Sequence, residues 1–243
     1  MPNPSHVEAY DALAEHIRAI DAAELVFVPS PGNWGDSLIN AGSREFFDAY
    51  SIDYREVRRE RLPRTDKLRD VHVVIGGGGG WCRFWHTTPE FVAEVQPVAG
   101  FVTVLPTSFA DAPVSPSEAE NLKLFSRGRT SLERQDMPLA FCHDMAFHCS
   151  AFTVPNGKRG GTLRALRTDV EGRGDESHTD SRDLSLEGDG FTDPRPLYHE
   201  IGRFTHVTTD RLHIGIAAAQ LGLDVELLSS GCPKIEGVCD LSM

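Results

Sequence analysis

A buried strand followed at once by five glycines is the feature that most limits what this chain can fold into. Val71 to Ile75 is an apolar run apart from His72, typical of a strand covered on both faces in a parallel sheet. Gly76 to Gly80 follow without interruption, and their lack of Cβ atoms permits close approach of a ligand or of other backbone. No Gly-Lys-Ser/Thr follows, and the aromatic residues 81–85 do not fit a dinucleotide fingerprint. We hypothesise a ligand-facing loop, with a tight turn as the alternative.

The first 150 residues repeat this order of strand, glycine-bearing loop and helix. Such alternation is typical of an α/β fold with a parallel sheet, whose ligand crevice lies at the carboxyl ends of the strands. The residues that follow predicted strands there are Gly32, Asn33, Asp36, Gly76, Gly77, Gly78 and Ser108. The pattern predicts helices at 7–20, 37–49 and 115–124, strands at 25–28, 71–75, 101–105 and 138–141, a strand ending near 57, and a strand-and-helix unit from 126. We expect Asp36 to cap the helix at 37–49 rather than to act as a base.

The chain after residue 150 is predicted to form a second, smaller α/β unit. Residues 150–162 are rich in glycine and indicate a linker, and residues 171–193 indicate a long charged loop. Strands are predicted at 163–166, 204–208 and 225–228, with a short helix at 198–203. The predicted domains are therefore residues 1–150 and 151–243.

The stretch from Thr208 to Gly222 carries the strongest chemical signal. Its apolar run predicts a buried helix that ends at a left-handed Gly222, with Asp210 as the N-cap. Arg211 and His213 then lie in the first turn, where the helix dipole disfavours a cation unless an anion also binds. Arg211 can clamp a carboxylate or phosphate, and His213 can supply a proton. The alternative is that Arg211 pairs with Asp210 or another carboxylate and that His213 is a packed histidine.

Composition excludes several classes of protein. The 24 basic and 36 acidic residues give a net charge of −12, which argues against a general binder of nucleic acid. No apolar segment is long enough to span a membrane, and the N-terminus lacks a signal-peptide pattern. The five cysteines are odd in number and lack close pairs, so we expect free thiols in the cytoplasm.

Two other polar segments are candidate sites. Arg127 follows a predicted strand, where it can hold an anion with its guanidinium fork or simply lie on a solvated surface. The run from Cys142 to Cys149 contains two histidines and Asp144, but its spacing matches no standard zinc pattern. We expect no metal there and consider Asp144 a cleft residue. The chain has no Gly-x-Ser-x-Gly elbow.

Taken in order, these segments resemble the polysaccharide pyruvyl transferase family over almost the whole chain. The matching pieces are Gly32-Asn33-Trp34-Gly35-Asp36-Ser37-Leu38-Ile39, Val74-Ile75-Gly76-Gly77-Gly78, Val104-Leu105-Pro106-Thr107-Ser108, Arg127 with Ser131, Asp144-Met145-Ala146, Thr209-Asp210-Arg211-Leu212-His213 and Pro233-Lys234-Ile235-Glu236-Gly237-Val238. The Arg-Leu-His segment and the first loop are the most specific. Thr107, Gly128 and His143 depart from residues common in the family.

The resemblance implies a GT-B-like architecture, in which two Rossmann-like domains face a cleft, with residues 1–150 on the acceptor side and 151–243 on the donor side. It implies phosphoenolpyruvate as donor substrate and no cofactor. His213 would be the general acid, Arg211 and Arg127 would hold the donor, and Leu212 would add a backbone contact. The remaining cleft-loop residues would be Asn33, Asp36, Gly76, Gly77, Gly78, Ser108, Asp144 and Lys234.

The acceptor that the resemblance implies is a sugar of a surface polysaccharide or of its lipid-linked precursor. Peripheral membrane association and a homo-oligomer that completes the short C-terminal part stay open. Two rival functions also stay open. One is a GT-B glycosyltransferase that uses a nucleotide-sugar, because the same loops suit a diphosphate. The other is a non-catalytic protein that binds an anionic sugar or phosphoenolpyruvate.

Overall fold

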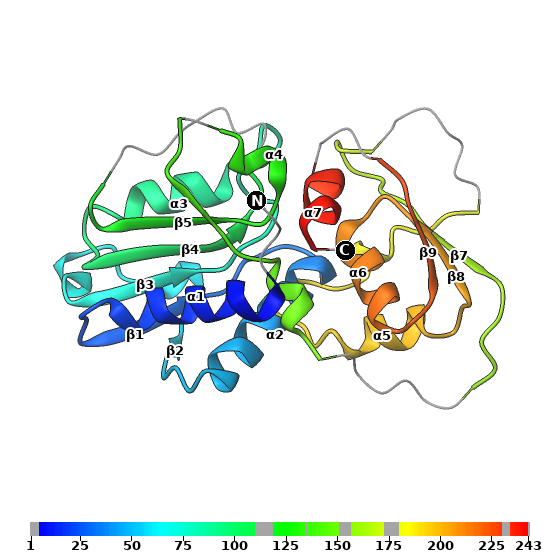
Figure 1. Cartoon of the computed structure of the whole chain (residues 1–243), viewed down its shortest axis with the longest axis horizontal. Helices are drawn as coiled ribbons and strands as arrows, with labels where there is room; N and C mark the ends of the chain where they lie inside the picture. Colours follow the sequence, from blue (N-terminus) through cyan, green and yellow to red (C-terminus); the bar gives the residue numbers. More distant parts are fainter. Residues whose placement is uncertain are drawn as a thin grey trace.

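Two parallel sheets organise the chain in a computed structural model that describes residues 5–109, 119–134, 136–150, 157–172, 180–229 and 234–242 (Figure 1). The larger sheet has the order β2-β1-β3-β4-β5-β6 and the smaller one the order β7-β8-β9. All pairings between the strands of these two sheets are parallel, which confirms the predicted α/β class and its Rossmann-like character. The strands are β1 (Glu24–Val28), β2 (Arg55–Glu56), β3 (Val71–Ile75), β4 (Phe101–Thr107), β5 (Leu122–Ser126), β6 (Leu139–Phe141), β7 (Thr162–Ala165), β8 (His206–Thr209) and β9 (Asp224–Leu227).

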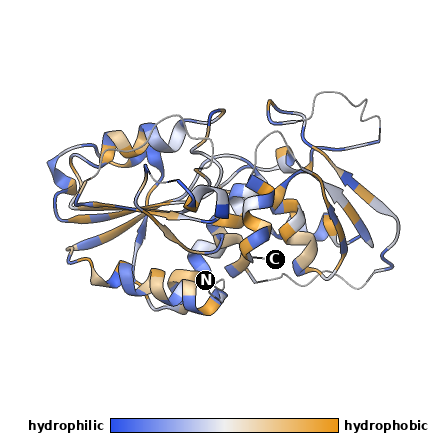
Figure 2. Cartoon of the chain, turned by 45° about the horizontal axis from the view of Figure 1, so that its top comes forward, coloured by the Kyte–Doolittle hydropathy of each residue, from blue (hydrophilic) through white to orange (hydrophobic). Residues whose placement is uncertain are grey.

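Helices cover both faces of the larger sheet. The α-helices are α1 (His6–Ala19), α2 (Trp34–Ala49), α3 (Thr87–Val95), α4 (Arg129–Leu132), α5 (Arg195–Ile201), α6 (Leu212–Gln220) and α7 (Lys234–Ser242). Short 3-10 helices are η1 (Arg59–Arg61), η2 (Asp66–Leu68), η3 (Met145–His148) and η4 (Leu184–Glu187). Strand β3 alternates between the faces: Val74 packs in the cluster that contains α1 and α2, and Val73 in the cluster that contains α3. Figure 2 shows hydrophobic residues concentrated along these strands.

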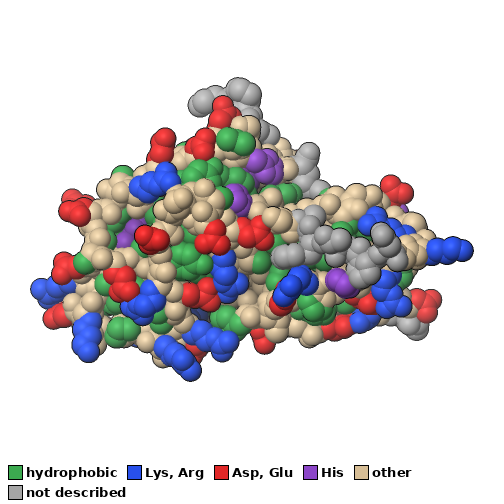
Figure 3. All heavy atoms as spheres, turned by 90° about the horizontal axis from the view of Figure 1, so that it is seen from below, with side chains coloured by type: hydrophobic (Ala, Val, Ile, Leu, Met, Phe, Trp, Pro, Cys, Tyr) green, Lys and Arg blue, Asp and Glu red, His purple; other side chains and the backbone are tan. Residues whose placement is uncertain are grey.

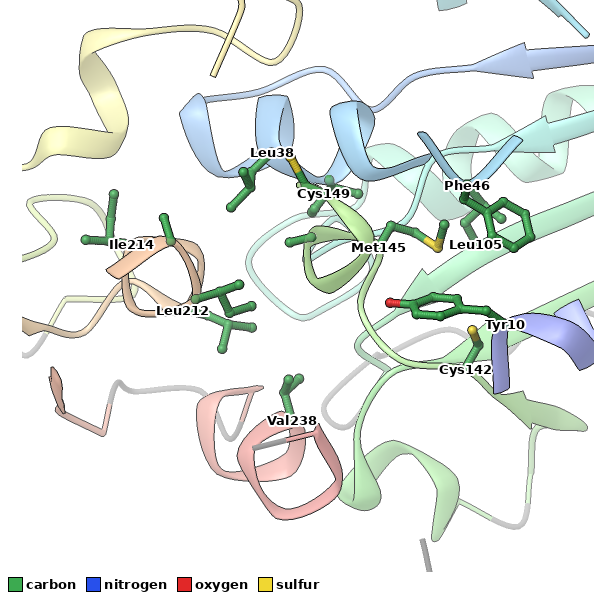
Figure 4. Close-up of a cluster of buried hydrophobic side chains, with 14 of the residues drawn as sticks. Tyr10, Leu38, Phe46, Leu105, Cys142, Met145, Cys149, Leu212, Ile214 and Val238 are labelled. Atoms are coloured by element: carbon green, nitrogen blue, oxygen red, sulfur yellow. The ribbon is translucent and has the colours of Figure 1, made fainter. Parts of the chain in front are cut away.

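One apolar core joins the two sheets. Leu38 of α2, Met145 of η3 and Ile214 of α6 belong to the same buried cluster (Figure 4). The approach of α2 to η3 is so close that a Cβ added at Gly42 would lie 1.8 Å from the carbonyl oxygen of Met145. The relative position of the sheets is therefore determined by tight packing among α2, η3 and α6.

Two predicted elements differ from the structure. The helix expected at 115–124 is wrong at its end, because Leu122–Ser126 is strand β5, paired with β4 and β6; residues 115–118 lie outside the described residues. Pairing on both edges overrides the helical periodicity that the sequence suggested. Helix α2 begins at Trp34 rather than at 37, because Asn33 and not Asp36 is its N-cap.

The last helix returns to the first half of the chain. Helix α7 packs against α4 and lies between the two sheets in Figure 1. At its end, Ser242 Oγ lies 2.7 Å from His143 Nδ1, and the Ser242 carbonyl oxygen lies 3.2 Å from His6 Nε2. The C-terminal helix therefore belongs to both halves of the structure.

Acidic and basic side chains are interspersed on the face shown in Figure 3. No helix among the described residues is long and apolar enough to cross a membrane.

Candidate active site

The candidate site lies where the strand order of the larger sheet reverses. The chain runs from β1 to β2 on one side of β1 and then crosses to β3 on the other side, so the switch point lies between the carboxyl ends of β1 and β3. Ser30, which follows β1, donates its hydroxyl to the carbonyl of Gly77, which follows β3, at 2.7 Å. A ligand crevice is expected at this edge, as the sequence predicted.

The glycine run serves two purposes. A Cβ at Gly76 would lie 2.7 Å from Ser30 N, and one at Gly77 would lie 2.2 Å from the Pro106 carbonyl oxygen, so these two glycines allow neighbouring backbone to pack. Gly78 has φ +126° and faces Asp36 Oδ1. Gly79 and Gly80 are half-buried, whereas Gly76, Gly77 and Gly78 are buried. The solvent-accessible part of the loop is therefore its second half.

Asn33 and Asp36 form a capping box at the start of α2. Asn33 Oδ1 accepts from Gly35 N at 2.8 Å, and Asp36 Oδ2 accepts from Asn33 N at 3.0 Å. Burial raises the pKa of Asp36, although the Asn33 N–H and the charges of His213 and Arg127 partly oppose the shift. The expectation that Asp36 itself caps the helix was wrong, because the carboxylate occupies the third helical position and reaches back.

Arg127 is buried at the carboxyl end of β5. Its Nε donates to Ser108 Oγ at 2.9 Å, and its Nη1 donates to Asp144 Oδ2. Asp144 in turn caps η3 by accepting from Ala146 N at 2.8 Å. Three residues predicted for the site, far apart in sequence, are thereby in direct contact.

His213 completes this cluster from the other sheet. As the second residue of α6, it places Nε2 at 3.2 Å from Arg127 Nη1 and 3.3 Å from Asp144 Oδ2. A protonated Nε2 donates to Asp144, and a deprotonated Nε2 accepts from Arg127, so either state has a partner. The side chain is 15% exposed, and a Cβ at Gly35 would lie only 2.8 Å from its Nδ1. Gly35 therefore makes room for the imidazole.

The charge of Asp144 is stabilised by its neighbours. Burial alone would raise the pKa of Asp144, but Arg127 and His213 hold it well below its ordinary value. Asp144 is therefore ionised at neutral pH and can orient His213. The nearby Asp36 has the opposite shift, and such divergence between neighbouring carboxyls is common in acid–base sites.

Arg211 lies in a different network. Its Nε is 3.0 Å from Asp183 Oδ1, its Nη2 also pairs with Asp183, and Nη2 is 3.0 Å from Asp169 Oδ2. The alternative of a carboxylate partner is therefore confirmed. Arg211, not Asp210, is the N-cap of α6, because Asp210 accepts from Arg167 N at 2.8 Å. Leu212 begins α6 with its side chain in the apolar core.

Lys234 reaches the glycine loop from α7. Its Nζ pairs with Glu171 Oε1 at 2.5 Å and lies 3.5 Å from the Gly79 carbonyl oxygen. Glu171 and Asp183 were missed by the sequence reading, because both lie in or beside a charged, glycine-rich segment that is typical of a solvated loop. The sequence signal that could have identified them was that the predicted site cations Arg211 and Lys234 require carboxylate partners.

The run from Cys142 to Cys149 is dispersed rather than clustered. Cys142 is buried, the ring of His143 stacks on His6 at 3.9 Å, and Cys149 Sγ lies 3.6 Å from Glu45 Oε1. Within the described ranges, no group of three or more His, Cys, Asp or Glu side chains can hold a metal ion. The cysteines that the structure describes are all free thiols, and Cys232 lies outside the described residues.

Comparison with known proteins establishes the fold alone. No protein-family model matches the chain, and no curated protein matches it. A crystal structure of a functionally uncharacterised protein from Klebsiella pneumoniae subsp. pneumoniae NTUH-K2044 aligns with a TM-score of 0.78 at 18% identity. The alignment covers 98% of this chain and 95% of that one. This architecture therefore also occurs in a bacterial protein over nearly the full length of that chain.

Proposed function

We propose that this protein transfers the pyruvyl group of phosphoenolpyruvate onto two hydroxyls of a sugar as a ketal and releases phosphate. The observation that carries the proposal is the meeting of Arg127, Asp144 and His213 beside the switch point. Each comes from a segment that resembles the pyruvyl transferase family. Residues scattered over 86 positions converge on one imidazole, as a general acid requires.

The proposed chemistry uses His213 as the proton donor. Its protonated Nε2 gives a proton to the methylene carbon of phosphoenolpyruvate, which leaves a cation-like centre at C2. A sugar hydroxyl attacks C2 and passes its proton to Asp36, and phosphate leaves with the C–O bonding pair and takes up that proton. A second hydroxyl closes the ketal, and its proton returns to His213. Asp144 holds the imidazole in orientation and stabilises its protonated form. Asp36 was expected not to act as a base, but in this proposal its raised pKa suits it to accept a hydroxyl proton.

In this proposal Arg127 partly neutralises the negative charge of the donor. Like His213, it contacts the carboxylate of Asp144. The protonated His213 that the proton-transfer step requires supplies the second positive charge. Arg211 has a different role in this proposal from the one expected. Its pairs with Asp183 and Asp169 hold the turn between β8 and α6, and this turn positions His213. The two sheets flanking the site fit a GT-B-like arrangement with residues 1–150 on the acceptor side.

The test is release of phosphate from phosphoenolpyruvate with a panel of free and lipid-linked sugars. His213→Ala should lower the rate by about 10²- to 10⁴-fold, the usual contribution of a general acid. The matched control is His199→Ala, which removes an exposed histidine from α5 and should retain the wild-type rate. Equal rates in the His213 variant and the wild type would rule the mechanism out.

A second pair of variants tests the arginine. Arg127→Lys keeps the charge but loses the fork between Ser108 and Asp144, so the KM for phosphoenolpyruvate should rise at least tenfold. Arg129→Lys, on the exposed start of α4, is the control. Turnover of nucleotide-sugars in place of phosphoenolpyruvate would favour the glycosyltransferase, and donor binding without phosphate release would favour a binding protein.

A further inference from the structure

An exposed indole stands directly after the glycine loop. Trp85 is 39% exposed, and it is the one exposed Phe, Trp or Tyr side chain among the residues that the structure describes. It closes a short turn in which Cys82 N donates to Trp85 O at 3.0 Å and Trp85 N donates to Cys82 O at 3.2 Å. Both ends of this turn are therefore hydrogen-bonded to each other, and the backbone of Trp85 is held in place.

The ring itself is also held. Trp85 Nε1 donates to Glu171 Oε1 at 2.7 Å, and the same oxygen pairs with Lys234 Nζ at 2.5 Å. The other Glu171 oxygen lies 2.7 Å from Arg167 Nη2, and the Glu171 side chain is 0% exposed. A fully buried carboxylate is costly unless it is paired, so this anchor is built from two cations and the indole N–H. A surface tryptophan of no further use does not need such an anchor.

The indole lies at the edge of the candidate active site. Lys234, bound to the same oxygen, also approaches the carbonyl of Gly79 at 3.5 Å. A Cβ placed on Gly79 would lie 3.8 Å from Arg127 Nη2. Glu171, Lys234 and Gly79 thus lie between the indole N–H and the guanidinium that contacts His213 and Asp144.

We propose that Trp85 is the platform on which the acceptor sugar stacks. A pyranose ring has faces of C–H groups and a rim of hydroxyls, and an aromatic ring covers the C–H groups while the hydroxyls stay free to react. An indole that is already fixed loses little conformational entropy on binding. The role of the bound sugar as acceptor rests on the proposed function, whereas the stacking of a sugar on Trp85 does not.

The surroundings favour a small ligand over a protein partner. Among large hydrophobic side chains that are exposed, Val170 is the one next to this anchor in sequence, so the apolar area is small. Stable protein interfaces bury about 800 Å² on each partner, far more than an indole and one valine supply. A single sugar ring matches the size of this platform.

The kinetic test compares Trp85→Ala with Trp85→Phe. The alanine variant should raise the KM for the acceptor about 10- to 50-fold, with the KM for phosphoenolpyruvate and kcat at saturating acceptor within twofold of wild type. The phenylalanine variant should recover most of the affinity because it restores a ring. Leu186→Ala removes another exposed apolar side chain and should change nothing. An unchanged acceptor KM in Trp85→Ala would overturn the platform.

A binding test separates this inference from the proposed function. Saturation-transfer NMR with methyl galactoside, methyl glucoside and methyl mannoside should show sugar protons contacting the wild-type protein, and the signal should disappear in Trp85→Ala. If the glycosides bind through Trp85 but no phosphate is released with any acceptor, the platform stands and the pyruvyl transfer fails. If phosphate is released but Trp85→Ala changes neither binding nor acceptor KM, the platform fails. The platform is also overturned if the protein neither binds the glycosides nor releases phosphate. It is likewise overturned if Trp85 stacks nucleosides and not glycosides.

Discussion

Gly42→Ala should destabilise the protein even though alanine is the better helix former. In the interior of α2 the exchange alone is worth about 1 kcal/mol in favour of alanine. The new Cβ, however, would lie 1.8 Å from Met145 O, 2.8 Å from Met145 C and 3.1 Å from Cys149 N, all of them backbone atoms of η3 or its C-cap. Backbone cannot rotate away as a side chain can, so α2 and η3 must separate.

Overpacking of a core typically costs about 1–3 kcal/mol, and a contact this short with backbone belongs at or above the upper end. After the helix gain, we expect a net loss of about 2 kcal/mol in the free energy of unfolding. For a chain of this size this corresponds to a fall of about 4–8 °C in Tm. Because Asp144 caps η3, the same displacement should also move the carboxylate away from His213 and lower activity.

The measurement is thermal and urea unfolding of the variant beside Gly160→Ala. A Cβ at Gly160 meets no atom within 4 Å, so this control should change Tm by less than about 2 °C. A Tm for Gly42→Ala equal to or above that of wild type would show that α2 and η3 are not in rigid contact, and the account of the shared core would be refuted.

Three further outcomes follow from buried charges. Asp183→Ala leaves the buried Arg211 short of a partner and should cost about 3 kcal/mol in urea unfolding, whereas exposed Asp193→Ala should cost less than about 0.5 kcal/mol. Burial lowers the pKa of His72 from 6.5 to about 4, so between these pH values the unfolded chain binds a proton that the folded chain does not. The free energy of unfolding should therefore fall by about 3 kcal/mol as the pH drops from 6.5 to about 4. This contribution should be absent in His72→Gln. The raised pKa of Asp36 means that its negative charge opposes folding at neutral pH, so Asp36→Asn should raise the Tm at pH 7. This gain in Tm should shrink as the pH falls. The same variant should release phosphate more slowly. A Tm unchanged by Asp36→Asn at both pH values would contradict that sign.

Strands with strong local signals were predictable from the sequence. Val71–Ile75 is apolar except at His72 because both faces of the strand are covered, and its bounds match β3. The left-handed Gly222 after α6 was also predicted and has φ +67°. Such features depend on residues close in sequence, and their physical causes are local.

Choices among neighbouring polar groups were less predictable. Asn33 and Asp36 are equally good caps, and only the backbone geometry decides that Asn33 caps while Asp36 reaches back. The partner of Arg211 was harder still, since Asp183 lies 28 residues away in a segment without periodicity. Arg127, Asp144 and His213 were each identified, yet their contact depends on how two sheets pack, which no local pattern encodes.

The return of α7 to α4 has a mechanical consequence. The chain passes from the larger sheet to the smaller one after η3 and comes back with α7, so the two sheets are connected at two places rather than one. A body attached at a single point can swing in any direction, whereas one attached at two points rotates chiefly about the line between them. Any motion that opens the site is thus confined to a hinge-like arc, and Lys234, at the start of α7, travels with it. Such a motion would therefore also displace that ammonium group.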